Sequence, residues 1–105
     1  MQEHIEIAGK TYPIKYGFNA LRIFTAETGT SLQDIAKLSE EITLNHAIVL
    51  MYAGLKDGAR AEKAQFNMSV EDVADLLDLD QEAMNKCLLV FARAFEDAGK
   101  MTAQK

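Results

Sequence analysis

Apolar and polar residues alternate along the first sixteen positions of the chain. Ile5 and Ile7 are separated by polar neighbours, and a second run over residues 11–16 follows Gly9. A period of two is typical of β-strands that bury one face, and a glycine that accepts a positive φ suits the tight turn between two such strands. The sequence therefore predicts a β-hairpin over residues 1–16.

After the hairpin the apolar residues recur with a helical period, and a residue suited to cap a helix N-terminus precedes each apolar run. These predicted caps are Asn19, Ser31, Thr43, Ser69 and Asp80. Gly29 and Gly99 are predicted to end the first and last helices, and the short second helix is predicted to end near Leu38. The expected fold is α+β and predominantly helical, with about five helices, two of them short, in one domain over residues 1–99 and a flexible tail over 100–105.

The third predicted helix, which begins after Thr43, is apolar nearly all round. Such a helix is typical of the centre of a core, and Leu44 is expected to lie on its buried face. Gly54 and Gly58 have low helix propensity, so we expect the later part of this helix, through Gln65, to fray or bend.

Three apolar residues that stand just before predicted helix caps are expected to fold back onto the first turn as hydrophobic staples. Phe18 is expected to pack onto Ile23 in this way, Met68 onto Val73, and Leu79 onto Met84.

The composition fits one globular domain: of 105 residues, 49% are hydrophobic and 26% charged. The single cysteine, Cys87, cannot form an internal disulfide. No apolar run approaches the length of a membrane span, and the N-terminus lacks the basic and apolar regions of a signal peptide. We therefore expect a cytosolic protein without membrane association.

The formal net charge of −5 argues against nucleic-acid binding, which usually needs a basic surface to neutralise phosphates. The densest basic stretch consists of Lys56, Arg60 and Lys63, interleaved with Asp57 and Glu62. This pattern is read as a solvated helix face, with a phosphate-binding track as the alternative.

No residue pattern supports catalysis or a cofactor. His4, His46 and Cys87 lack the spacing of a metal site. His46 is expected at the surface of a first helical turn. Cys87 lies mid-helix among apolar residues and is expected to be a buried, inert thiol rather than a nucleophile. The chain is therefore predicted not to be an enzyme.

An acidic stretch contains the spacing that opens a calcium loop, beginning at Asp78. Ala83 replaces the glycine needed at the sixth loop position, and Leu89 replaces the bidentate glutamate at the twelfth. Carboxylates at two successive helix N-termini explain the stretch without calcium, because they favour the positive end of the helix dipole.

The last helix carries more apolar surface than one core stripe requires. Either part of this surface is exposed and contacts a partner, or the third and last helices pack side by side in the core. The residues predicted to bind a partner protein are Tyr52, Leu89 and Val90, with an acidic docking face as the next candidate at Glu71, Asp75 and Asp78.

Three stretches in a fixed order carry a resemblance to a known family. The first is the strand, glycine turn and strand over 5–16, running into a helix at 17–21. The second is an apolar helix ending in Tyr-Ala-Gly-Leu at 52–55, and the third is the Ser-Val-Glu-Asp-Val-Ala-Asp helix start at 69–75. In this order they resemble the tail assembly chaperones of long-tailed bacteriophages and prophages, over most of residues 5–98.

The resemblance implies a role in assembly. Such chaperones coat the long, helical tape-measure protein in the cytoplasm of the bacterial host while the tail tube polymerises, and then leave, so they are absent from the mature virion. Many also have a longer product, made by a ribosomal frameshift, whose extension recruits tail-tube protein; this chain would match the short form. The implied partners are the tape-measure protein, the tail-tube protein and further copies in a homo-oligomer. The competing interpretation is a small acidic adaptor or regulatory domain of bacterial or phage origin.

Overall fold

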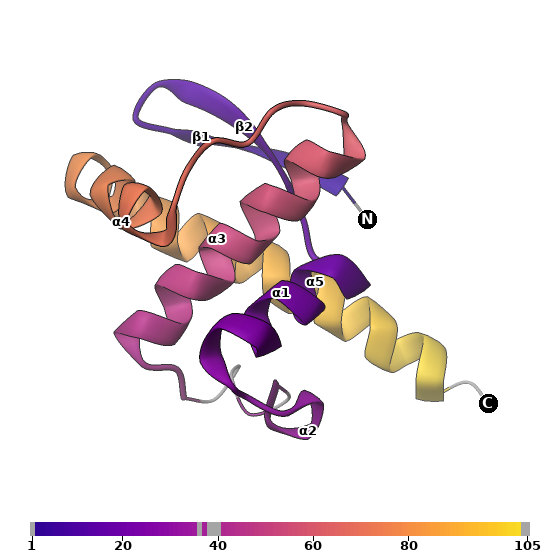
Figure 1. The fold of residues 1–105 in the computed structure, drawn as a ribbon. Coiled ribbons are helices and arrows are strands. Elements are labelled where there is room, and N and C mark those ends of the chain that lie inside the picture. Colours follow the sequence, from indigo (N-terminus) through magenta and orange to yellow (C-terminus); the bar gives the residue numbers. More distant parts are fainter. Residues whose placement is uncertain (1, 36, 38–40, 104–105) are drawn as a thin grey trace.

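The computed structural model describes residues 2–35, 37 and 41–103. Two strands, β1 (Gln2–Ile7) and β2 (Lys10–Lys15), precede the helices. The helices are α1 (Phe18–Thr28), α2 (Leu32–Ile35), α3 (Leu44–Ala61), α4 (Val70–Leu79) and α5 (Glu82–Ala103). The predicted α+β, predominantly helical fold is confirmed, with its N-terminal hairpin and five helices (Figure 1).

The hairpin is antiparallel, and one of its faces is buried against the helices. Ile7 and Ile14 are fully buried. Both turn residues have positive φ, 52° at Ala8 and 85° at Gly9, as a two-residue hairpin turn of type I′ requires. The alternation seen in the sequence therefore sets which side of the hairpin faces the core.

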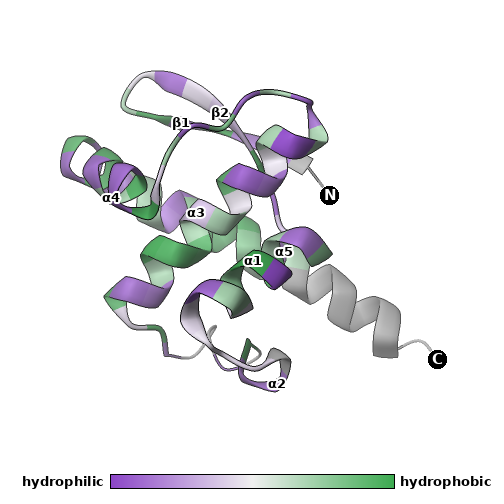
Figure 2. Ribbon diagram, in the orientation of Figure 1, coloured by the Kyte–Doolittle hydropathy of each residue, from purple (hydrophilic) through white to green (hydrophobic). Residues whose placement is uncertain are grey.

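Helix α3 is the central element, as predicted. It crosses the middle of the molecule, with the hairpin, α1, α4 and α5 arranged around it (Figure 1). Apolar residues cover its middle turns, where Leu50, Met51 and Leu55 are buried (Figure 2). The expectation for Leu44 is wrong: it is the first helical residue and 70% exposed, because it lies before the turns that the neighbouring elements cover.

Gly54 and Gly58 allow close packing, and the prediction that they loosen the later part of α3 is wrong as far as Ala61, whereas residues 62–65 lie outside the helix. The helix continues to Ala61 through both positions, and both glycines are buried. A Cβ at Gly54 would lie 2.4 Å from Cζ of Tyr16, and one at Gly58 would lie 2.5 Å from the backbone carbon of Pro13. Only glycine at these positions lets the hairpin approach so near to the helix.

Four of the five predicted caps form hydrogen bonds. The side chains of Ser31, Thr43, Ser69 and Asp80 accept from backbone N–H groups two or three residues on. At α4 the cap is a complete capping box, because Asp72 also accepts from the N–H of Ser69 at 2.9 Å. The start signals in the sequence thus fix most helix boundaries.

The start of α1 differs from the prediction. Gly17, not Asn19, is the N-cap, and no side chain caps this helix. Phe18 is therefore the first helical residue, and at 88% exposure it does not staple onto Ile23. Leu79, another predicted staple, is likewise exposed, at 74%, whereas Met68 is partly buried against the core.

Helix ends agree with the prediction at one glycine and not at the other. Gly29 ends α1 with a φ of 73°, and its N–H donates to the carbonyl of Thr25. Gly99 does not end α5, which continues to Ala103, so the first part of the predicted tail is helical. Residues 104–105 and the predicted end of α2 at Leu38 lie outside the described residues.

Candidate functional site

The two α5 residues predicted to bind a partner have opposite environments. Leu89 is 60% exposed, whereas Val90 is 2% exposed and belongs to the core with Cys87 and Phe91. Successive helical residues point about 100° apart, so only one of the two can face outward while α5 packs on α3. The prediction that Val90 is accessible is therefore wrong, and the two helices do pack side by side.

Tyr52 is half-buried on α3 and takes part in a small aromatic cluster. Its ring packs edge-to-face on Phe66, with ring centroids 5.6 Å apart. The Lys56 ammonium lies 5.5 Å from the Tyr52 ring centroid and donates to the Tyr52 hydroxyl at 3.4 Å. Because these neighbours cover part of the ring, Tyr52 is only partly accessible to a partner.

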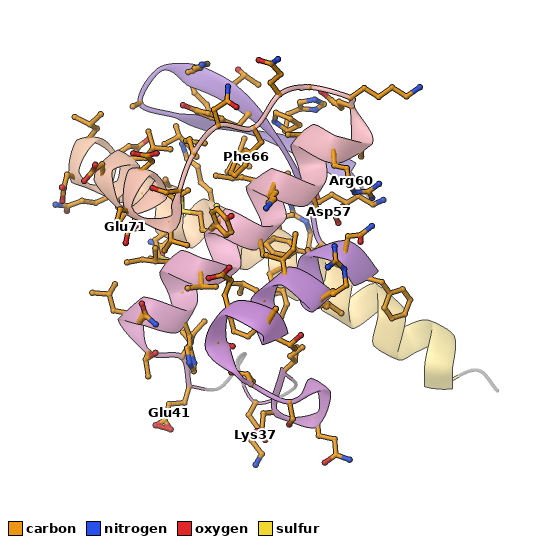
Figure 3. The ribbon with its side chains drawn as sticks, viewed as in Figure 1. Lys37, Glu41, Asp57, Arg60, Phe66 and Glu71 are labelled. Carbon is orange, nitrogen blue, oxygen red and sulfur yellow. The ribbon has the colours of Figure 1, made fainter. Side chains whose placement is uncertain are left out.

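The acidic residues predicted as a docking face lie together on α4. Glu71, Asp75 and Asp78 are all exposed, and their spacing places them on one side of the helix. Glu71 lies across α3 from Arg60 and Asp57 (Figure 3). The structure therefore brings these three carboxylates together, apart from the basic residues of α3.

Other exposed apolar side chains add to the surface that a partner can contact. Among the side chains that the structure describes, the exposed large hydrophobic residues are Phe18, Leu44, Leu79 and Leu89. The first three were predicted to be buried or stapled. All three lie at a helix terminus, where a periodic pattern cannot tell the last packed turn from the first exposed one.

A hollow of about 430 Å³ lies between α1 and α3, and we call it the α1–α3 groove. Its lining residues come from one face of α1, the end of α3 and the loop after it: Asn19, Arg22, Ile23, Ala26, Glu27, Lys56, Asp57, Arg60, Ala64 and Phe66. A second hollow of about 380 Å³ shares Ala64 and Phe66 and extends to β2. Both hollows have the size of ordinary ligand pockets.

Asp57 anchors one wall of the α1–α3 groove. Its side chain is fully buried, and one oxygen accepts from the Arg60 guanidinium at 3.0 Å while the other accepts from the N–H of Gly17 at 3.3 Å. The basic stretch is thus not a uniformly solvated face, because Asp57 ties α3 to the start of α1. An acid within a charged run gives no sequence signal that it is buried.

The remaining candidate residues take structural positions. Burial raises the pKa of the Cys87 thiol to about 12, as expected for an inert core cysteine. Burial also raises the pKa of Tyr16, whose hydroxyl donates to the carbonyl of Leu50. His46 is half-buried rather than at the surface, with its ring 5.8 Å from that of Phe24.

Within the part of the chain that the structure describes, no three His, Cys, Asp or Glu side chains are grouped to hold a metal ion. No described helix is both long and apolar enough to cross a bilayer. Comparison of the chain with protein-family models, with curated proteins and with solved structures found no match.

Proposed function

We propose that the chain is a tail assembly chaperone of a long-tailed bacteriophage or prophage. In this role it binds the tape-measure protein during tail assembly and helps to recruit tail-tube subunits. The observation that carries the proposal is the exposure of Leu89 on α5 of an acidic domain that already has a complete core. An exposed leucine on a packed helix suits contact with apolar helical stretches of a partner.

The physical demands of the task fit this surface. A protein that coats a long helix meets many similar apolar stretches and needs only modest affinity at each one. Separate exposed side chains, here Phe18, Leu44, Leu79 and Leu89, serve that purpose better than one deep pocket. The carboxylates on the acidic face of α4 add negative charge. Such charge opposes aggregation of the free domain while these apolar side chains are exposed.

Co-expression with a tape-measure fragment tests the proposal. Leu89→Asp is expected to leave the fold intact, because exposed positions usually tolerate substitution within about 0.5 kcal/mol, and to abolish co-purification. Asn85→Asp is the matched control, since it adds the same charge one turn earlier on α5 at an exposed position. If the Leu89→Asp variant still co-purifies with the fragment, the contact does not depend on Leu89 of α5.

Gene order separates this function from the adaptor alternative. A chaperone gene is expected between a tail-tube gene and a very long tape-measure gene. A gene surrounded by regulators, with no tail genes nearby, would favour a small acidic adaptor or regulatory domain instead.

A further inference from the structure

The α1–α3 groove has a charge opposite to that of the chain. Three cations and two carboxylates line it, whereas the whole chain has a net charge of −5. One of the two carboxylates, Asp57, is fully buried beneath Arg60, whose own side chain is 55% exposed. The accessible rim of the groove is therefore predominantly basic.

Two of the cations have no carboxylate partner among the described residues. Arg22 donates to the side-chain oxygen of Asn19 at 3.4 Å, and Lys56 donates to the hydroxyl of Tyr52 at 3.4 Å. Both acceptors are neutral, so neither positive charge is compensated. An acidic ligand would gain an ion pair at each position without breaking an existing one.

The floor of the groove is apolar. Ile23 and Ala26 line it from α1, and Phe66 lines it from the loop after α3. The lining residues of α1, from Asn19 to Glu27, extend over about 12 Å, which is roughly two helical turns. An apolar floor of this length between two helices has the shape that accepts one face of a third helix.

We propose that the α1–α3 groove binds an amphipathic helix of another protein, in which carboxylates flank an apolar stripe. The apolar side chains would contact Ile23, Ala26 and Phe66, and the carboxylates would pair with Arg22 and Lys56. No residue of α5 lines the groove, so the proposal does not depend on the tape-measure contact at Leu89.

A second copy of this chain fits the groove less well than a foreign helix. Its acidic helix, α4, is ten residues long and directs its apolar stripe toward its own core, where Val73 is fully buried. Only Leu79 among its large apolar residues is exposed. Self-docking would thus supply carboxylates without the side chains that fill the apolar floor.

Titration of the labelled chain with a synthetic peptide, followed by backbone amide NMR, tests this proposal. The probe is a helical peptide of about 18 residues with a leucine stripe flanked by glutamates, long enough to form a helix. Its control has lysine in place of every glutamate. The glutamate peptide is expected to shift the amides of residues 19–27 and 56–60, and the lysine peptide to leave them unchanged.

Matched charge reversals locate the contact. Lys56→Glu is expected to weaken binding by about fivefold to tenfold, whereas Lys37→Glu, an equal change at an exposed lysine of another part of the surface, changes it less than about twofold. Ala26 is an exposed α1 residue that lines the groove. Ala26→Glu places a carboxylate there and is therefore expected to block binding of the acidic peptide as well. The same spectra show whether each variant is folded.

Four results would overturn the proposal. In the titration, these are no binding at millimolar glutamate peptide, equal binding of the lysine peptide, or amide shifts confined to α4 and α5. In the charge reversals, the fourth is an equal loss of peptide affinity in Lys37→Glu and Lys56→Glu. Sedimentation of the free chain is the remaining measurement: self-association that Lys56→Glu abolishes would identify a second copy as the occupant.

Discussion

The ring of Tyr16 fills the space that a side chain at Gly54 would occupy. A Cβ at position 54 would lie 2.4 Å from Cζ of this ring, and the Tyr16 hydroxyl donates a 2.9 Å hydrogen bond to the carbonyl of Leu50 one turn earlier. The ring also packs edge-to-face against Phe91 of α5, with centroids 5.3 Å apart. One tyrosine after the hairpin therefore contacts two of the core helices, α3 and α5.

Gly54→Ala is expected to destabilise the domain by about 1–3 kcal/mol through overpacking against Tyr16. Alanine favours a helix by about 1 kcal/mol over glycine, so a rise in stability would contradict the close contact. Chemical unfolding followed by circular dichroism measures the difference. Asn85→Ala, at an exposed position of α5, is the control and is expected to change stability by less than about 0.5 kcal/mol.

Among the side chains that the structure describes, two Asp–basic pairs have the same i,i+3 spacing and different burial. Asp57 is fully buried beside Arg60, whereas Asp34 is 55% exposed at 3.8 Å from Lys37. Asp57→Ala leaves the N–H of Gly17 without its acceptor and is expected to cost about 1–3 kcal/mol. Asp34→Ala is expected to cost less than about 0.5 kcal/mol, and equal losses of unfolding free energy would contradict the role assigned to Asp57.

Asp80 is expected to make stability depend on pH in the acid range. The hydrogen bond from the N–H of Ala8 is the main reason that its pKa is lowered, and Lys86 lowers it further. Because the folded pKa is below the unfolded one, the stabilisation is present above the ordinary carboxyl pKa and is lost as the pH falls through the folded pKa. The melting temperature of Asp80→Asn should therefore fall less steeply with acidification than that of the native chain.

Asp78→Asn is the control for this measurement, because Asp78 is exposed two residues away. Its acid dependence is expected to match that of the native chain. If Asp80→Asn and the native chain lose stability in parallel down to pH 2.5, the carboxylate does not hold the hairpin turn.

Cys87 is expected to resist modification in the folded domain. With its pKa raised to about 12, on the order of one thiol in ten thousand is ionised at pH 8, and the side chain is also buried. Ellman's reagent should react slowly with the native protein and within seconds in denaturant. Fast reaction of the native protein would mean that α5 separates readily from α3.

The sequence predicted the elements of this fold better than their ends. Caps with a side-chain acceptor, such as Ser69 and Thr43, were found because their hydrogen bonds are local. Gly17 was missed because a glycine cap has no side-chain signal, and Gly99 was misread because only a left-handed conformation, as at Gly29, makes a glycine end a helix.

The candidate surfaces were less predictable, because they depend on which helix covers which face. Leu89 and Val90 are adjacent apolar residues that the sequence alone does not distinguish. The packing of α5 against α3 buries Val90 and leaves Leu89 exposed. The α1–α3 groove combines residues far apart in the sequence, such as Arg22 and Lys56, so no local pattern indicates it. The burial of Asp57 depends on the same tertiary contact.

The most direct test of the chaperone proposal is the mass of the complex that the purified chain forms with a helical fragment of the tape-measure protein. Light scattering after size exclusion is expected to give several copies of the chain on each fragment, with the number rising with fragment length. Leu89→Asp should remain folded and leave the fragment uncoated. A folded native chain that adds no mass to the fragment would contradict the proposal.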